Sequence, residues 1–191
     1  MESLMIIILA IILIICVFAI FYATIYNKFQ DYIIRINEVE AMIDTNLRNK
    51  YDLYNKVIPI IKGSNKDKAK EKEKEKEPEI FSEIVKLRSR KIGNFELYRI
   101  LGRADAELIK LENEIKGLDK NEDIKKIKEQ IEEINLKIDN AAQYYNDNIT
   151  IYNTLLKKFP SNLIAACCKY KEKLFFDRKD MSDEDYDDFK L

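Results

Sequence analysis

Apolar side chains recur at alternating steps of three and four residues over most of the stretch 121–166. This spacing places them along one stripe of an α-helix, and five heptads without a break predict a long helix packed against other helices. Pro160 should end this helix, because proline has no backbone N–H and clashes with the preceding turn. The stripe consists of Ile124, Ile127, Ile131, Ile134, Ile138, Ala141, Tyr145, Asn148, Tyr152, Leu155 and Phe159.

A second stripe with the same spacing covers residues 27–62 and predicts a helix continuous with the apolar segment before it. Glu40 and Lys50 are its polar interruptions. Pro59 should kink the last turn, and Gly63 should end the helix. The apolar members of the stripe are Phe29, Ile33, Ile36, Ile43, Leu47, Tyr54, Val57 and Ile61.

Two more segments show apolar faces of helical period. Residues 79–92 have a broad apolar face, and residues 95–116 have a third stripe of three-and-four spacing, formed by Leu97, Leu101, Ala104, Leu108, Leu111 and Ile115. Gly102, inside the second segment, either allows a close helix approach or is tolerated at a cost of about 1 kcal/mol. No segment alternates like a strand, so the sequence predicts an all-α fold: an elongated antiparallel bundle of three to four long helices.

Residues 4–21 are an unbroken apolar run, and no charged residue occurs between Ser3 and Asn27. A helix from Leu4 to Ile25 would be about 33 Å long, which is enough to cross the hydrocarbon core of a bilayer. We therefore predict one transmembrane anchor over residues 4–26, with the lipid bilayer as its partner.

A cleaved signal peptide is the alternative for this segment, but the chain has no basic start and the apolar core is too long. Lys28 and Arg35 follow the span, whereas Glu2 is the one charged residue before it. The positive-inside rule then predicts a single-pass protein whose C-terminal domain is cytoplasmic.

The remaining parts of the chain predict a helical domain over 27–176 with two solvated segments. Residues 64–79 form a Lys/Glu tract with no apolar anchor except Ala69, and residues 177–191 form an acidic tail that should be mobile. The tract alternates in sign from one residue to the next, which is not the spacing that supports a helix.

Charge and composition exclude several classes of function. The 191 residues carry 33 basic and 34 acidic side chains, so the chain lacks the basic excess of a nucleic-acid-binding protein. It has no histidine, the usual general base and the commonest metal ligand. No glycine-rich phosphate loop or nucleophile motif occurs. We expect a protein that is not an enzyme and has no cofactor and no metal site.

The cysteines do not change this expectation. Zinc needs about four ligands, and the chain offers only Cys167 and Cys168 outside the apolar segment that contains Cys16. We expect Cys167 and Cys168 to be small buried apolar residues.

One candidate interaction site lies in the C-terminal half of the longest predicted helix. Tyrosine hydroxyls and amides there could rim a groove for a ligand or a partner. The structural alternative is that two of the tyrosines pack into the seam and that Asn148 fixes its register. The residues concerned are Tyr144, Tyr145, Asn146, Tyr152 and Asn153.

A second candidate site follows directly, at Pro160, Ser161, Asn162 and Leu163. On a structural interpretation, Ser161 or Asn162 caps the start of a new helix, and Leu163, Ile164 and the pair Phe175-Phe176 fold back on the bundle. Alternatively, residues 163–170 and the Phe pair dip into the membrane interface. The head groups would then meet Lys169, Lys171 and Lys173.

The same region resembles the C-terminal signature of the LemA family of bacterial membrane proteins. That signature is an Ala-Ala-x-x-Tyr-Tyr-Asn-like run, then Tyr-Asn, then Phe-Pro-Ser-Asn-Leu-x-Ala, then a Phe-Phe pair. The matching positions are Ala141, Ala142, Tyr144, Tyr145, Asn146, Tyr152, Asn153, Phe159, Pro160, Ser161, Asn162, Leu163, Ala165, Phe175 and Phe176. The resemblance implies one N-terminal membrane helix, a long antiparallel helical domain on the cytoplasmic side, and no established enzymatic activity.

Two hypotheses for function follow. The first is a non-enzymatic scaffold, anchored in a bacterial cell membrane, that binds a protein partner or further copies of itself. The second is a membrane-organising or membrane-shaping protein that assembles on the lipid surface.

Overall fold

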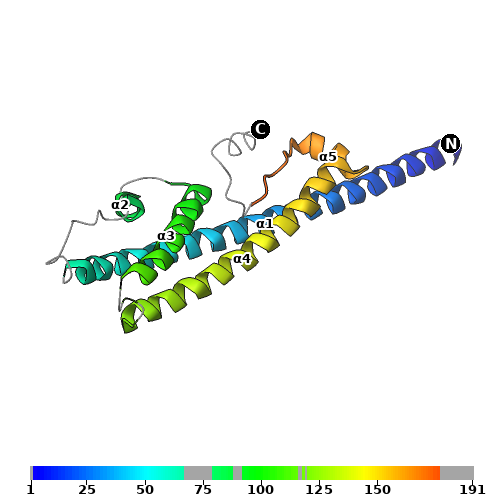
Figure 1. The fold of residues 1–191 in the computed structure, drawn as a ribbon. Coiled ribbons are helices and arrows are strands. Elements are labelled where there is room, and N and C mark those ends of the chain that lie inside the picture. Colours follow the sequence, from blue (N-terminus) through cyan, green and yellow to red (C-terminus); the bar gives the residue numbers. More distant parts are fainter. Residues whose placement is uncertain (1, 67–78, 88–91, 116–117, 119, 177–191) are drawn as a thin grey trace. The chain divides into compact units, whose positions relative to one another are not determined.

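The computed structural model describes residues 2–66, 79–87, 92–115, 118 and 120–176. These residues form five α-helices and no strand. Figure 1 shows the helices as a ribbon along the chain. The helices are α1 (Glu2–Lys66), α2 (Glu79–Lys86), α3 (Asn94–Glu114), α4 (Glu122–Lys157) and α5 (Ser161–Cys168). The predicted all-α fold with long helices is confirmed.

The chain divides into two compact units. The first combines the chain up to Val39 with Tyr144–Phe176, and the second contains Glu40–Gln143. Both α1 and α4 contribute one part of their length to each unit.

The helix α1 continues past both points at which the sequence predicts a disturbance. Pro59 lies inside the helix, and Val57, Ile58 and Ile61 are buried on either side of it, so packing offsets the lost backbone hydrogen bond. The predicted end at Gly63 is wrong, because the helix reaches Lys66. Gly63 does not adopt the positive φ of a glycine helix cap.

In the second unit, the apolar stripes of α1 and α3 are buried. On α3, all six predicted stripe residues are buried. Gly102 is exposed, and a Cβ added there would meet no atom within 4 Å, so it does not serve a close helix approach. The helix α2 contacts α3 and buries Phe81 and Ile84; the expected continuation of this helix over 88–91 lies outside the described residues.

The helices α3 and α4 are antiparallel within this unit. Two contacts show the direction: Asp105 accepts a hydrogen bond from Asn135, and Glu112 pairs with Lys128 at 2.7 Å. The residue number rises on one helix as it falls on the other. At the start of α4, the Asn121 side chain accepts hydrogen bonds from the backbone N–H groups of Asp123 and Ile124, which caps the helix.

The stripe of α4 is buried along most of its length. Phe159, its last member, departs from the prediction: 79% of its surface is exposed, because α4 ends at Lys157 and the chain has already left the helix. Ile127, Ile134 and Leu155 are half-buried. The buried members are Ile124, Ile131, Ile138, Ala141, Tyr145, Asn148 and Tyr152.

The two segments predicted to be solvated lie mostly outside the described residues. Of the tract 64–79, the structure describes 64–66 as the last residues of α1 and Glu79 as the first residue of α2. The tail 177–191 is outside the description entirely.

Candidate functional site

The first unit contains the corner between α4 and α5, where the sequence places Pro160, Ser161, Asn162 and Leu163. The Ser161 hydroxyl lies 2.6 Å from the carbonyl oxygen of Leu155 and 2.8 Å from that of Lys158. It therefore caps the carbonyl of Leu155 in the last turn of α4 and adds a second bond to the carbonyl of Lys158, which also accepts from the backbone N–H of Asn162. The predicted capping of α5 by Ser161 or Asn162 is wrong, because Pro160 occupies the capping position and no side chain caps this helix.

The outer surface of the corner is apolar. Phe159 and Leu163 are 79% and 58% exposed, and Cys167 is exposed as well. Ile164 and Ala165 face the other way and are buried. The expected burial of Cys167 is thus wrong, since it lies on the outward face of α5, and Cys168 is only half-buried.

A neighbouring side of α5 meets α1, and Leu163, although largely exposed, contributes to both surfaces. A groove of about 500 Å³ lies between them, and its lining is almost entirely apolar. Where α5 ends, the hydroxyl of Tyr22 lies 3.6 Å from Cys168 Sγ. The corner therefore lies beside the second half of the apolar segment of α1. The groove is lined by Ile15, Phe18, Ala19, Phe21, Tyr22, Pro160, Leu163 and Ile164.

Tyr145 and Tyr152 are buried in the first unit rather than on its surface. The ring of Tyr152 packs edge-on against Phe29, with 5.8 Å between ring centres, and that of Tyr145 packs edge-on against Phe176 at 6.4 Å. Burial also raises the pKa of the Tyr152 phenol. This packing fits the structural alternative for the two residues. Tyr144 lies apart from them and is exposed.

Asn148 is buried, and its amide donates to the carbonyl oxygen of Tyr144 at 2.7 Å. That bond lies within α4, one turn back along the helix. The amide is thereby paired inside its own helix, which gives no support to the expectation that Asn148 fixes the register between helices.

Two asparagines of α4 hold the segment that follows α5. Asn146 exchanges two hydrogen bonds with the backbone of Phe176, at 2.6 and 2.7 Å. Asn153 makes the same pair of bonds with the backbone of Lys173, at 2.9 and 3.0 Å. Seven residues of helix and three residues of extended chain both span about 10 Å, so the two pairs match in spacing.

These asparagines are not among the residues of the corner, and their role was missed from the sequence. The signal that could have found them is the Tyr-Asn pair that occurs twice at heptad spacing, at 145–146 and 152–153. In each pair the tyrosine packs inward and the asparagine beside it meets the extended backbone. At Asn146 and Asn153, the amides predicted to lie on the rim of a groove are therefore engaged by the chain's own backbone.

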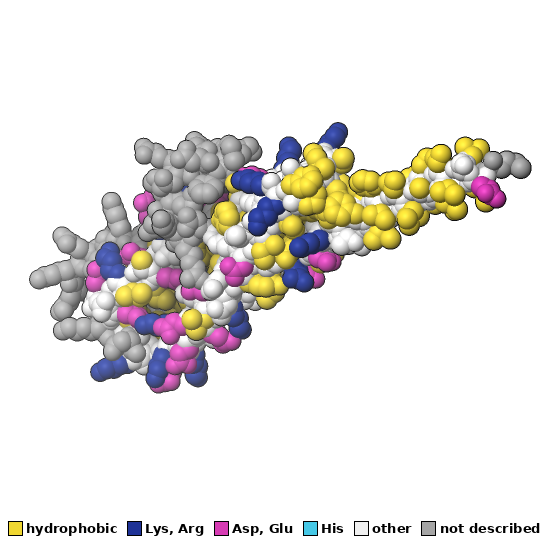
Figure 2. Space-filling model, turned by 90° about the vertical axis from the view of Figure 1, so that its right-hand side faces the viewer, with side chains coloured by type: hydrophobic (Ala, Val, Ile, Leu, Met, Phe, Trp, Pro, Cys, Tyr) yellow, Lys and Arg dark blue, Asp and Glu magenta, His cyan; other side chains and the backbone are white. Residues whose placement is uncertain are grey.

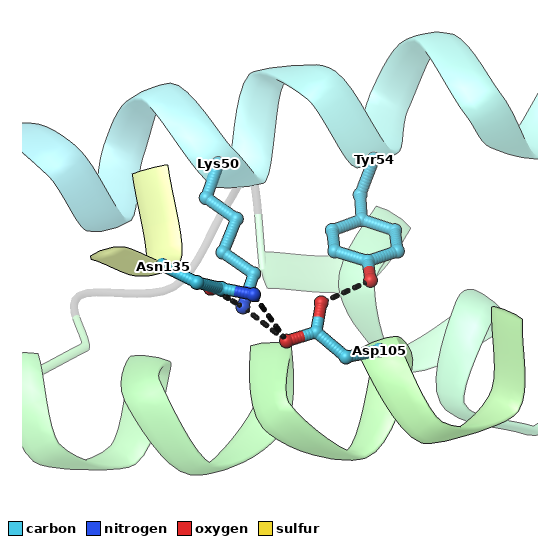
Figure 3. Close-up of polar contacts among 4 residues, drawn as sticks. All are labelled: Lys50, Tyr54, Asp105 and Asn135. Carbon is cyan, nitrogen blue, oxygen red and sulfur yellow. Dashed lines mark hydrogen bonds and ion pairs between the residues drawn. The ribbon is translucent and has the colours of Figure 1, made fainter. Parts of the chain in front are cut away.

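The second unit contains a buried polar cluster, drawn in Figure 3. Lys50 Nζ on α1 lies 2.5 Å from Asp105 Oδ2 on α3 and donates to Asn135 Oδ1 on α4 at 2.7 Å. The hydroxyl of Tyr54 donates to the other oxygen of Asp105. Lys50 and Tyr54 thus both donate to the carboxylate of Asp105, and Lys50 also donates to the amide of Asn135. These bonds join side chains from three helices.

Burial governs the electrostatics of this cluster. It lowers the pKa of Lys50, while the nearby carboxylate of Asp105 acts in the opposite direction. Burial and then Asp105 raise the pKa of Tyr54. Because the side chain of Lys50 is only 4% exposed and its ammonium group donates to both Asp105 and Asn135, the cluster ties helices together and does not present a reactive group to solvent.

Metal chemistry finds no support within the part of the chain that the structure describes. No group of three or more His, Cys, Asp or Glu side chains there could hold a metal ion.

Comparison with known proteins gives one finding. A sequence model of the LemA family matches residues 39–187, which is more than half of the chain. The match begins beyond the apolar segment at the N-terminus. No curated protein and no solved structure matches the chain.

Proposed function

Because this chain belongs to the LemA family, we propose that it is a non-enzymatic helical scaffold, anchored in a membrane, that binds a protein partner or further copies of itself. The observation that carries the proposal is the surface of the N-terminal part of α1. Every described residue from Glu2 to Thr24 is exposed, and almost all of these side chains are apolar. Figure 2 shows this part of α1 covered in apolar side chains.

Water is a poor environment for such a surface. Within the described residues, α1 carries the one segment long and apolar enough to cross a membrane, and none of that segment is buried. Each Leu, Ile, Val or Phe near the middle of a membrane helix favours insertion by about 0.3–0.6 kcal/mol. Insertion of the segment that runs from Leu4 to Tyr26 is therefore favoured by several kcal/mol in total.

The scaffold role is supported by the nature of the polar groups. The polar cluster around Lys50 is shielded, and the asparagines of α4 bind the chain's own backbone. Such groups hold helices and chain segments in place. Exposed apolar side chains on the second unit, among them Met42, Ile109 and Leu136, are available to a partner helix.

We place the anchor in a bacterial cell membrane, with the helical domain on the cytoplasmic side. The charges of Lys28 and Arg35 after the span support this orientation. The test uses Leu136→Cys in a chain whose three native cysteines are replaced by serine. A membrane-impermeant maleimide should label this cysteine after permeabilisation of the cells and not before. Labelling of intact cells would overturn the orientation.

The scaffold itself is tested by crosslinking in membranes, followed by purification of the full-length chain. Defined partners or a defined homo-oligomer should be recovered. The control is the same chain solubilised in detergent before crosslinking, which dilutes chance neighbours. If membranes and detergent extracts both yield only monomer, the scaffold proposal fails.

A second candidate function, organisation of the lipid surface, is favoured by the exposed apolar corner around Phe159 and Leu163. The N-terminal segment of α1 is sufficient as an anchor, so anchoring alone does not account for the exposed apolar side chains of the corner. Flotation of the full-length chain with vesicles cannot separate the two roles, because α1 alone would float it. The separation requires a probe on the corner itself.

A further inference from the structure

We infer that the corner between α4 and α5 is a second membrane contact of this chain: it enters the leaflet beside α1, and its groove holds an acyl chain of a bilayer lipid. The inference rests on the proposed membrane anchor. It goes beyond that anchor because it assigns a ligand and a depth to a part of the chain far from the N-terminus.

The depth of the corner follows from the residues of α1 that it contacts. The groove has Ile15, Phe18 and Tyr22 on its α1 side. Ile15 lies about 16 Å before Tyr26 along the helix, at 1.5 Å per residue, and this is about half the thickness of the hydrocarbon core. Because α5 packs against residues 15–22 of α1, it lies at the same depth in the bilayer as those residues. When α1 spans a bilayer, the corner must therefore lie among acyl chains.

The side chains and hydrogen bonds of the corner suit a hydrocarbon environment. No charged side chain occurs from Phe159 to Cys168. The Ser161 hydroxyl is hydrogen-bonded to the carbonyl oxygen of Leu155 in α4 and to that of Lys158 just after α4, and the backbone N–H of Lys169 closes the end of α5 by bonding to Ala165 and Ala166. Asn162 is the exception among the described residues of the corner, because its side-chain oxygen is buried and makes no hydrogen bond. Backbone and hydroxyl groups that are paired internally can enter hydrocarbon at little cost.

Lysines mark both ends of the apolar stretch. Lys157 and Lys158 precede Phe159, while Lys169 and Lys171 follow α5, and all four are exposed. Lys157 also forms an ion pair with Glu172 at 2.8 Å. Long lysine side chains can extend toward lipid head groups while the chain between them is in hydrocarbon. Figure 2 shows Lys and Arg side chains around a group of apolar side chains beside the exposed apolar N-terminal part of α1.

The occupant of the groove follows from continuity with α1. One wall of the groove is the surface of α1 that a bilayer would surround, and the other is α5, with an apolar lining on both sides. The molecules that surround α1 at this depth are lipid acyl chains. Water is a poor occupant, because a buried water needs two to four polar partners and this lining offers almost none.

The test measures depth at native positions of the full-length chain in phosphatidylcholine vesicles containing phosphatidylglycerol. One variant keeps Cys16 alone and reports on the anchor, and a second keeps Cys167 alone and reports on α5. A third carries Leu163→Cys, and a fourth carries Leu136→Cys as its matched control, both in a cysteine-free chain. Leu136 is an exposed leucine of the second unit, comparable in exposure to Leu163.

Each cysteine is labelled with an environment-sensitive fluorophore. Probes at 16, 163 and 167 should be quenched by lipids that carry a spin label on the acyl chain and shielded from iodide. The probe at 136 should show the reverse, with at least a fivefold larger iodide quenching constant. If 163 and 167 are as accessible to iodide as 136 while 16 is shielded, the inference is overturned and the anchor stands. If 16 is accessible too, the anchor itself fails.

A second copy of the chain is the competing occupant. Dilution of the protein in the vesicles, from about one chain in 200 lipids to one in 5000, separates the two. Shielding that is independent of dilution supports the lipid; shielding that is lost on dilution, with 16 still shielded, overturns it in favour of a dimer.

A charge on the corner gives a further measurement. Leu163→Lys should raise the iodide accessibility of the probe at 167 several-fold and leave the probe at 16 unchanged. Leu136→Lys is the matched control and should change neither. An unchanged probe at 167 in the Leu163→Lys chain would overturn the placement of the corner in hydrocarbon.

Discussion

Lys50 and Asp105 form an ion pair across α1 and α3, with 2.5 Å between Nζ and Oδ2. The side chain of Lys50 is 4% exposed, and that of Asp105 is 25% exposed. Such a pair adds little net stability, since desolvation of both charges opposes their attraction. It does make one alignment of the helices better than others, because a shift along either helix would leave a buried charge without its partner.

Replacement of Lys50 by methionine should therefore destabilise the second unit. Asp105 would lose its cation while it stays partly buried, and we expect a loss of about 2–3 kcal/mol in the free energy of unfolding. This is less than the 3–5 kcal/mol typical of fully buried pairs, because Asp105 keeps contact with water, Tyr54 and Asn135. Urea unfolding in detergent micelles, followed by circular dichroism, measures it.

The control for this variant is Lys137→Met. Lys137 forms an ion pair with Glu133 on the exposed surface of α4 at 2.7 Å. Because both side chains are in water, the midpoint of urea unfolding should not change. Equal losses for the two variants would show that Lys50 contributes no more than a surface lysine.

Tyr54 gives a dependence of stability on pH. Burial and Asp105 raise its pKa in the folded chain. Above about pH 10 the unfolded chain loses this proton while the folded chain keeps it, so stability falls as the pH rises. In Tyr54→Phe, the slope of unfolding free energy against pH between 10 and 11 should be shallower by up to about 1.4 kcal/mol per pH unit.

The slope in Tyr54→Phe should not vanish. Burial also raises the pKa of Tyr152 and of Tyr170, so each adds to the alkaline loss. Between pH 7 and 9, where tyrosines stay protonated, the curves of the two chains should run parallel. Identical slopes above pH 10 would contradict the burial of the Tyr54 phenol.

Asn146→Ala should release the chain end near Phe176. The variant leaves the backbone N–H and carbonyl of Phe176 without the partners they have at 2.7 and 2.6 Å. The loss should be about 1–2 kcal/mol locally. Hydrogen exchange of the segment 171–176 should become at least about fivefold faster. Asn140→Ala is the matched control, since Asn140 is exposed on the same helix; it should leave this exchange unchanged.

Gly102→Ala should stabilise the second unit by up to about 1 kcal/mol. Gly102 lies inside α3, and a Cβ there meets nothing within 4 Å, so alanine brings its helix propensity without a clash. Urea unfolding measures the gain. The exposed Ala106 of the same helix provides the reverse change, because Ala106→Gly should cost a similar amount. A loss in Gly102→Ala would reveal a close contact at this surface.

The long helices were predictable because their apolar spacing repeats over many turns. The stripe of α3 needed no correction, since every member is buried. Lys50 shows the limit of such patterns. A lysine on an apolar stripe is interpreted as an interruption of that stripe. Its partner Asp105 lies far away in sequence, on another helix, so a local sequence pattern does not predict the pair.

The candidate site was less predictable for a related reason. Ser161 has the residue type of a helix cap, but the direction in which it bonds depends on where α4 ends. Likewise, Phe159 continues the heptad spacing of α4, although the helix has ended two residues earlier. In an eight-residue helix such as α5, the outward face is set by its neighbour α1, and spacing alone does not identify it.

The two asparagine pairs have a practical consequence. Asn146 and Asn153 bind main-chain atoms, so α4 fixes the path of residues 173–176 independently of the side chains of that segment. Leu174 and Phe175 are free to change without moving the backbone, and both are exposed. A tag or a fused domain attached after Phe176 would start from a backbone position that Asn146 fixes, whatever sequence is attached there.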